Sequence, residues 1–148
     1  MTAQPPTERA PIDLSVNNAL IEGYLPAHMG VVFTHIEYGR CEARLELAPH
    51  HMAPNGFLHA ATVISLADTA AGFGCRNSLP EGASGFTTID LNCSYLGTAT
   101  EGVITVVARL MHGGRTTQVW DAEVRRENAE KPMALFRCTQ MVLYPRAP

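Results

Sequence analysis

The chain has 148 residues, of which 46% are hydrophobic and 17% are charged. This composition suits one globular domain with a core and excludes a disordered or fibrous chain. The formal net charge of -3 gives no general attraction to nucleic acid or to an anionic membrane, so we expect neither as a partner. Any anionic ligand must therefore bind at a local basic cluster.

The cysteines stand singly in the sequence, without the paired spacing of a zinc site or a disulfide framework. They are Cys41, Cys75, Cys93 and Cys138. Residues 1–14 lack the basic start and apolar core of a signal peptide, and no apolar run is long enough to span a bilayer. We expect no metal site and a cytoplasmic location.

The first part of the chain is rich in proline and polar residues, so residues 1–12 are predicted to be a mobile segment. Residues 13–146 then form a single domain. The sequence LSVNNALIEGYL, residues 14–25, has apolar residues at partly helical spacing and predicts a short helix that Gly23 and Pro26 interrupt.

Two runs that flank Gly39, residues 31–38 and 40–47, predict a hairpin, because the second run alternates apolar with charged residues. The segment 50–56 is rich in turn-forming residues. Its adjacent His50 and His51 are expected to diverge in an extended segment, which argues against a shared metal ion.

A helix is predicted over residues 59–75, and strand patterns follow to the end of the chain. The strands cover residues 87–95, 102–112, 116–127 and 133–144. Short turns between them favour an antiparallel meander of four strands. The predicted class is α+β, with about six antiparallel strands and one long central helix. Tyr95 and Trp120 lie in the strand patterns and are expected in the core.

Asp68 stands in the middle of the predicted helix, whose circumference is otherwise almost entirely apolar or small. A surface helix would show a charged stripe, so Asp68 is expected in a largely dry place. Burying a carboxylate is costly unless it is paired, hydrogen-bonded or protonated. Asp68 is either a structural carboxylate that bonds a strand hydroxyl or a neighbouring chain, or a group that performs chemistry.

His59 is placed at the start of the same helix, where the amides of Ala60 and Ala61 would point at an anion or a polarised carbonyl oxygen. About nine residues, or roughly 13 Å of helix, separate this tip from Asp68. One helix cannot easily bring both groups to one bond. A second copy of the chain could, which favours a site shared between two subunits.

The stretch NGFLHAATVISLADTA, followed by TTIDLNCSYLGTATEGVITVVARLMHGGRTTQVWDAEV, resembles hotdog-fold acyl-CoA thioesterases of the phenylacetate-pathway (PaaI-like) and 4-hydroxybenzoyl-CoA thioesterase type. The resemblance covers residues 28–144. It implies a hotdog fold, in which the sheet wraps around the helix, and hydrolysis of an acyl-CoA thioester. It implies no cofactor beyond the coenzyme A of the substrate, and a homodimer or a homotetramer built as a dimer of dimers.

The resemblance also implies roles for individual residues. Asp68 would be the general base or nucleophile, the amide of Ala60 would polarise the thioester carbonyl, and His59 would shape the helix start, with Ala61 beside the substrate. Thr88 matches a family Ser or Thr that helps to position the attacking water. The family has His-Gly-Gly where this chain has two alanines after the histidine.

A second departure concerns the family's Asn or Gln six residues before the histidine, where this chain has Ala53. Asn55, four residues before it, would take the same role through a differently shaped loop. The coenzyme A phosphates need a basic residue, and the resemblance favours Arg115 after the Gly113–Gly114 turn. Less specific candidates are Arg76, Arg125, Arg126 and Lys131.

Aromatic residues that could enter the cleft and set the acyl preference are Phe57, Phe73, Phe86 and Tyr95. Two other functions remain open. One is a hotdog hydratase or dehydratase, which also pairs a histidine with an acidic residue. The other is a non-catalytic acyl-CoA-binding protein, in which the two alanines at the helix tip mark lost chemistry.

Overall fold

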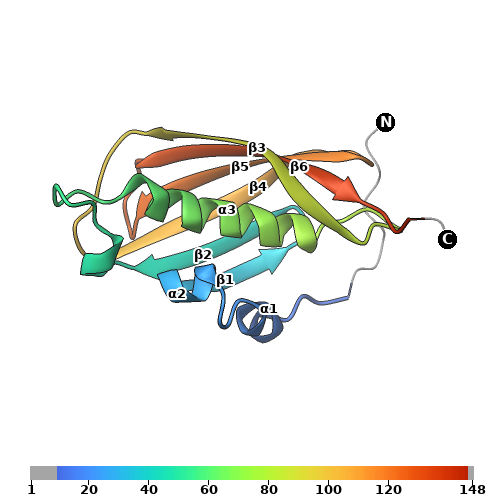
Figure 1. Ribbon diagram of the computed structural model, residues 1–148, viewed down its shortest axis with the longest axis horizontal. Helices are drawn as coiled ribbons and strands as arrows, with labels where there is room; N and C mark the ends of the chain where they lie inside the picture. The colour runs from blue at the N-terminus through green and yellow to red at the C-terminus, as the bar shows by residue number, and fades with distance from the viewer. Residues whose placement is uncertain (1–9, 147–148) are drawn as a thin grey trace.

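A single antiparallel sheet carries one long helix across one of its faces (Figure 1). The computed structural model describes residues 10–146, so most of the predicted mobile segment, residues 1–9, lies outside the described residues. The elements in chain order are α1 (Leu14–Leu20), α2 (Leu25–Met29), β1 (Val31–Glu37), β2 (Arg40–Glu46), the 3-10 helix η1 (Pro49–His51), α3 (Ala60–Arg76), β3 (Gly85–Tyr95), β4 (Val103–Gly113), β5 (Thr117–Arg126) and β6 (Ala134–Leu143). The predicted α+β class, with six antiparallel strands and one long helix, is confirmed.

The strand order β1-β2-β4-β5-β6-β3 corrects the predicted meander of the last four strands. Strands β4, β5 and β6 do follow one another as neighbours, but β3 lies at the far edge beside β6, and β4 pairs with β2. Alternation identifies a strand and its two faces, but it carries no information about which strand lies next to it. The chain enters β3 from α3 and then crosses back to the middle of the sheet.

The predicted short N-terminal helix is present as α1, which ends at Leu20, before the interruption expected at Gly23. Asp13 caps α1 by accepting the amide of Ser15 at 2.8 Å. Gly23 has a φ of 80° and turns the chain, and Pro26 then stands in the first turn of α2. Proline is tolerated there because the first amides of a helix have no intrahelical acceptor. Pro26 therefore belongs to the start of a second helix.

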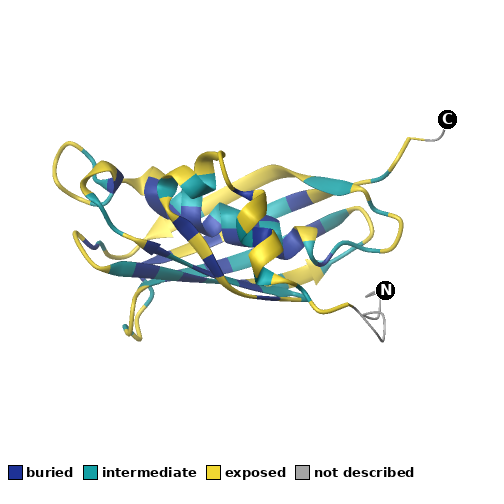
Figure 2. Ribbon diagram, turned by 90° about the horizontal axis from the view of Figure 1, so that it is seen from below, coloured by how far each residue is buried: buried dark blue, intermediate teal, exposed yellow. Residues whose placement is uncertain are grey.

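Helix α3 packs its small and apolar residues onto the inner face of the sheet (Figure 2). Trp120 of β5 is fully buried beneath it, and a Cβ atom on Gly74 would lie only 2.6 Å from the Trp120 ring. This close approach explains a glycine in the interior of a helix. The packing fixes how the helix is rotated about its axis, and so it fixes where Asp68 points.

Strand β3 differs from the other strands because much of it is exposed. Ile89, Leu91 and Tyr95 have exposed fractions of 52%, 40% and 43%. The expectation that Tyr95 belongs to the core is therefore wrong, whereas Trp120 is buried as expected. Among the described residues, β3 has a strand neighbour on one side only, so its outer edge and its apolar side chains are uncovered in the single chain.

Candidate functional site

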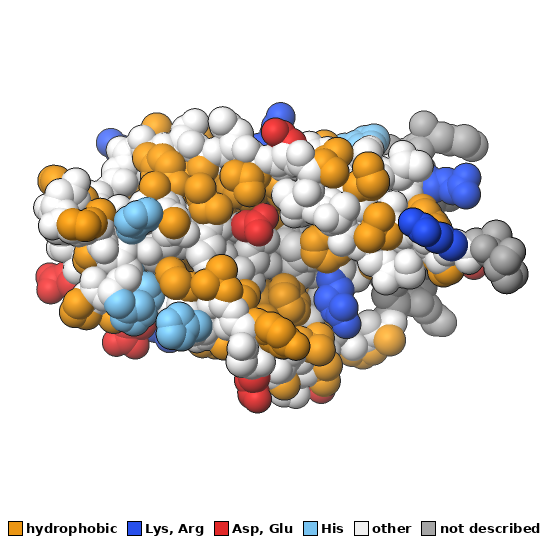
Figure 3. Space-filling model, viewed as in Figure 1, with side chains coloured by type: hydrophobic (Ala, Val, Ile, Leu, Met, Phe, Trp, Pro, Cys, Tyr) orange, Lys and Arg blue, Asp and Glu red, His pale blue; other side chains and the backbone are white. Residues whose placement is uncertain are grey.

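Asp68 lies on the side of α3 that faces a pocket rather than the sheet. The pocket has a volume of about 380 Å³ and is lined by Leu20, Pro26, Asp68, Thr69, Gly72, Phe73, Arg76, Phe86 and Thr88. Four elements build it, since α3 forms its floor, β3 forms one wall, and α1 and α2 form the other. Hydrophobic side chains predominate on this face of the molecule (Figure 3).

The Oδ1 atom of Asp68 is buried and has no hydrogen-bond partner among the described residues. Burial raises the pKa of the Asp68 carboxyl above its ordinary value, because the charged form loses hydration without gaining a cation. The alternative in which Asp68 bonds a strand hydroxyl of its own chain is not what the structure shows. A half-buried carboxylate whose buried oxygen has no partner, placed in a pocket, is a candidate for chemistry.

Ser65 precedes Asp68 by one turn of α3, and its hydroxyl is likewise buried without a hydrogen-bond partner in the described part of the chain. Two polar side chains on one face of a helix are thus left unsatisfied. Native proteins rarely leave such groups unpaired, so this face is where water, a substrate or another chain is expected to supply partners.

Thr88 reaches the same pocket from β3, as its predicted role requires. Its hydroxyl donates a hydrogen bond of 2.8 Å to Oε1 of Gln140, a fully buried side chain on β6. With its hydrogen committed to Gln140, the Thr88 oxygen can only accept further hydrogen bonds from the pocket. Sequence reasoning missed Gln140, whose one signal was a polar residue at an inward-facing position of β6.

The structure has His59 at the start of α3, as predicted, but the amide of Ala61 is not free to bind a ligand. His59 is the N-cap, and its Nδ1 atom accepts the amide of Ala61 at 3.0 Å, so that amide is already used inside the helix. The amide of Ala60 has no acceptor among the described residues. The hydroxyl of Tyr95 donates to the carbonyl oxygen of Ala60 at 2.8 Å and ties the helix tip to β3. One amide, not two, is therefore available at this tip.

A buried histidine fixes the loop that leads to this tip. His51 accepts the amide of Ala48 through Nδ1 at 2.9 Å, and its Nε2 lies 2.7 Å from the carbonyl oxygen of Met29. Burial lowers the pKa of His51, which favours the neutral ring with its proton on Nε2. His50 and His51 belong to η1 and their rings lie 4.1 Å apart, so the expected extended segment with diverging side chains is wrong.

Of the predicted site residues, Asp68 and Thr88 line the pocket, and the residues of the helix tip, His59, Ala60 and Ala61, do not. Two more predicted site residues also lie away from it. Asn55 is in the exposed turn before α3, where its side chain accepts the amide of Phe57 at 3.2 Å. Arg115 is exposed beyond β4, with its guanidinium 5.6 Å from the Tyr144 ring. Of the four aromatic residues proposed for the cleft, Phe73 and Phe86 line the pocket, and Phe57 and Tyr95 do not.

Thiol and metal chemistry gain no support from the described residues. The thiols of Cys41, Cys75 and Cys138 are buried, and burial raises the pKa of each to about 12, which keeps them protonated. Within residues 10–146, no group of three or more His, Cys, Asp and Glu side chains is placed to hold a metal ion.

None of the helices in this part of the chain combines the length and apolar character that a membrane crossing requires.

The sequence matches the family model of the thioesterase superfamily over residues 55–133. This range contains the start of α3, Asp68 and Thr88. The chain belongs to the thioesterase superfamily. Its fold is accordingly the hotdog fold, as the resemblance implied, and the general reaction that the family supports is hydrolysis of a thioester.

Individual relatives agree with the family assignment. A 1,4-dihydroxy-2-naphthoyl-CoA hydrolase from Listeria monocytogenes is 30% identical over 75% of this chain and 89% of its own length. The proofreading thioesterase EntH from Klebsiella pneumoniae is 28% identical over 81% of this chain and 87% of its own. The crystal structure of a thioesterase from Haemophilus influenzae superposes with a TM-score of 0.84 at 26% identity, covering 91% of this chain and 93% of the other.

Proposed function

We propose that the protein hydrolyses acyl-CoA or aryl-CoA thioesters to the free acid and coenzyme A, with Asp68 as the catalytic carboxylate. The observation that carries this proposal is the half-buried carboxylate of Asp68, whose buried Oδ1 has no partner among the described residues, in a mainly apolar pocket beside Thr88. Membership of the thioesterase superfamily and the named CoA thioester substrate of the Listeria relative support the same reaction.

In the proposed reaction, Asp68 accepts a proton from a water molecule while the water oxygen attacks the thioester carbonyl carbon. Thr88 accepts the other hydrogen of this water, because its own hydrogen is held by Gln140. The tetrahedral intermediate then expels the thiolate of coenzyme A, which takes the proton from Asp68. Direct attack by the Asp68 carboxylate is the other route that the family resemblance leaves open.

The developing oxyanion needs a hydrogen-bond donor, and the amide of Ala60 has the required freedom at the helix tip. It lies about eight residues, or roughly 12 Å of helix, from Asp68 of the same chain. We therefore propose that the donor comes from a second copy of the chain, in a homodimer or a homotetramer. The uncovered outer edge and exposed apolar residues of β3 support this assembly.

His59 and Ala61 have supporting roles in this proposal. His59 holds the first turn of α3 through the amide of Ala61, which leaves the Ala60 amide as the donor at the tip. The methyl groups of both alanines border the path of the thioester. Asn55 would contribute from the adjacent loop, and Arg115 would bind a phosphate of coenzyme A. The reaction as proposed needs no metal and no redox cofactor.

The test is thiol release from a panel of short, medium-length, long and aromatic acyl-CoA esters. Release by the wild type supports hydrolysis and defines the acyl preference. A change in an α,β-unsaturated acyl group without thiol release would indicate a hydratase instead. A rise in melting temperature without any turnover would indicate a binding protein. A monomer in solution that hydrolyses these esters would contradict the shared site.

A further inference from the structure

The pocket that contains Asp68 holds a second charged group, Arg76, at the C-terminal end of the same helix. Asp68, Gly72 and Arg76 follow one another at intervals of four residues, so they share one face of α3. About 12 Å of helix axis separates the backbone positions of Asp68 and Arg76. The arginine side chain leans back toward the helix N-terminus, which brings its guanidinium nearer to Asp68.

The surface between these two charges is mainly apolar. Leu20 and Pro26 line it from the N-terminal helices, and Phe73 and Phe86 line it from α3 and β3. Gly72 leaves room in the middle, since a Cβ atom there would lie 3.3 Å from Cζ of Phe86. Such walls suit the hydrocarbon part of an acyl group better than the polar nucleotide of coenzyme A.

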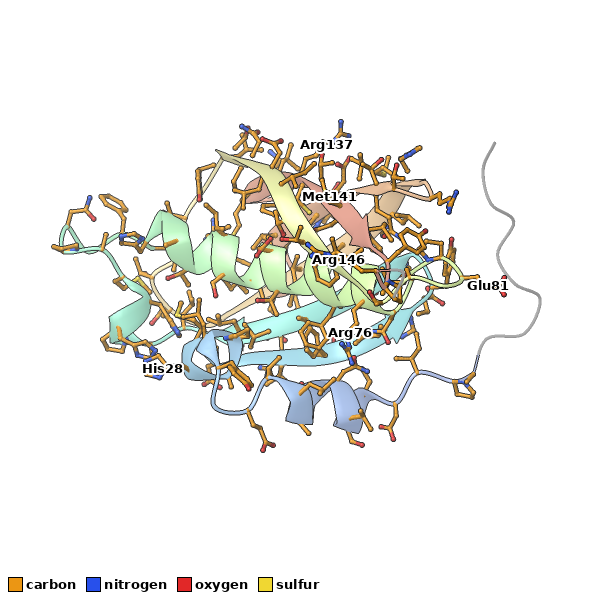
Figure 4. The ribbon with its side chains drawn as sticks, turned by 45° about the vertical axis from the view of Figure 1, so that its right-hand side comes forward. His28, Arg76, Glu81, Arg137, Met141 and Arg146 are labelled. Atoms are coloured by element: carbon orange, nitrogen blue, oxygen red, sulfur yellow. The ribbon has the colours of Figure 1, made fainter. Side chains whose placement is uncertain are left out.

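Arg76 has no ion pair or hydrogen bond with any described residue. Other arginines of the chain do have acidic partners, as Arg137 has in Asp121. Figure 4 shows Arg76 on the side of α1 and the end of α3, well separated from Arg137. A guanidinium matches a carboxylate in shape and charge and binds it through two parallel hydrogen bonds.

From this arrangement we infer that Arg76 is a specificity-determining residue that binds an anionic group at the far end of the acyl chain. The substrate class is a medium-length acyl thioester with a terminal carboxylate, whose hydrocarbon lies along Phe73 and Phe86. This inference rests on the proposed function, because it takes the Asp68 end of the pocket as the place of the reacting thioester. The anionic phosphates of coenzyme A are the other source of the same ligand chemistry.

The test compares adipoyl-CoA with hexanoyl-CoA, which have equal chain lengths and differ at the terminal carboxylate. We expect the wild type to show a kcat/KM about tenfold higher for adipoyl-CoA, as suits a charge-assisted hydrogen bond in a partly open pocket. Arg76→Met should lower kcat/KM for adipoyl-CoA and remove the preference, and Arg76→Lys should keep part of it. Arg109→Met is the matched control, because Arg109 is an exposed arginine of β4 outside the pocket.

Other outcomes would overturn the inference. If Arg76→Met lowers kcat/KM equally for adipoyl-CoA and hexanoyl-CoA, Arg76 binds the coenzyme A phosphates instead. Thioesters of N-acetylcysteamine, which lack these phosphates, should still show the preference for the adipoyl group. If the wild type hydrolyses hexanoyl-CoA without preferring adipoyl-CoA, the inference fails while the proposed function stands.

If neither of these esters nor any ester of the panel releases thiol, the proposed function fails, and the melting temperature with adipoyl-CoA and with hexanoyl-CoA still measures recognition. A larger stabilisation by adipoyl-CoA that Arg76→Met removes would then support the role of Arg76, and equal stabilisation by the two esters would contradict it.

Discussion

Two aspartates of this chain occupy opposite environments. Asp121 lies on β5, on the sheet face away from α3, and the guanidinium of Arg137 on β6 donates to both of its carboxylate oxygens, at 2.5 and 2.7 Å. Asp68 lies on α3 in an apolar pocket, and its buried Oδ1 has no partner among the described residues. Asp121 is thus paired although it is partly exposed, whereas Asp68 is unpaired although its lost hydration makes a partner more important for stability.

This contrast distinguishes a charged group in a surface ion pair from a charged group that is available for a reaction or a ligand. A solvent-exposed ion pair contributes about 1 kcal/mol or less, so Asp121 can be lost at little cost. A buried carboxylate without a partner lowers stability, and such a group is expected where a reaction or a ligand uses it. The two arginines follow the same division, since Arg137 is paired on the outer face, whereas Arg76 in the pocket has no ion-pair partner among residues 10–146.

The largest expected effect is the difference between Asp68→Asn and Asp121→Asn in thiol release. Asp68→Asn should lower kcat by on the order of a hundredfold or more, because the amide cannot accept the proton of the attacking water. Asp121→Asn should leave kcat close to that of the wild type. Equal losses in the two variants, or none in Asp68→Asn, would remove the distinction between the two carboxylates.

The next effect concerns Thr88. Thr88→Val should lower kcat by roughly tenfold to a hundredfold, as expected for losing a hydrogen bond to a positioned water. Thr88→Ser keeps the hydroxyl and should retain most activity. Thr139→Val, a matched change on the outer side of β6, is the control for general effects on the sheet. If Thr88→Val and Thr139→Val hydrolyse equally well, Thr88 does not position the water.

The unpaired state of Asp68 also predicts how stability depends on pH. Its pKa is raised in the folded protein, so between its unfolded and folded pKa values the folded state keeps a proton that the unfolded chain releases. The contribution of Asp68 to stability therefore falls as the pH rises through this window. As the pH rises through this window, the free energy of unfolding of Asp68→Asn should increasingly exceed that of the wild type. Above the window, the difference between the two should remain constant. A wild type that gains on the variant as the pH rises would show that Asp68 is paired after all.

The smallest effects distinguish the two sides of α3. Gly74→Ala should lower the free energy of unfolding by about 1–2 kcal/mol, because the clash with Trp120 outweighs the better helix propensity of alanine. Gly72→Ala should change stability by less than about 1 kcal/mol, since Phe86 can shift a little into the pocket. Chemical denaturation measures both. The opposite ranking would mean that the pocket side, and not the sheet side, is the tightly packed one.

Some residues of the site could be predicted from the sequence because their immediate sequence neighbours indicate where they lie. A lone aspartate among small and apolar residues identified Asp68, and the helical pattern placed His59 at the start of the helix, where the structure has it as the N-cap. Other parts depend on contacts between distant segments. Gln140 acts on Thr88 across a strand pair, and Arg76 enters the pocket only because α1, α2 and β3 surround the end of α3. Nothing in the immediate neighbourhood of either residue indicates these contacts.

The fold shows the same limit. Alternation predicted both β2 and β3, yet β2 lies between two strands and β3 lies at an edge with exposed apolar residues. Period-two patterning marks the two faces of a strand but not its neighbours, so the strand order and the exposure of Tyr95 could not be predicted. The alternation of Ile89 and Leu91 is compatible with a face that only a second copy of the chain would cover.

The most direct test of the central claim is kcat/KM for thiol release measured as a function of pH. Because Asp68 must be deprotonated to act as a base, we predict that kcat/KM rises with pH through an apparent pKa above that of an ordinary aspartate and then levels off. The residual rate of Asp68→Asn should lack this rise. A wild-type rate that stays constant through the acid range, or a variant that reproduces the same rise at the same rate, would contradict the assignment of Asp68 as the catalytic base.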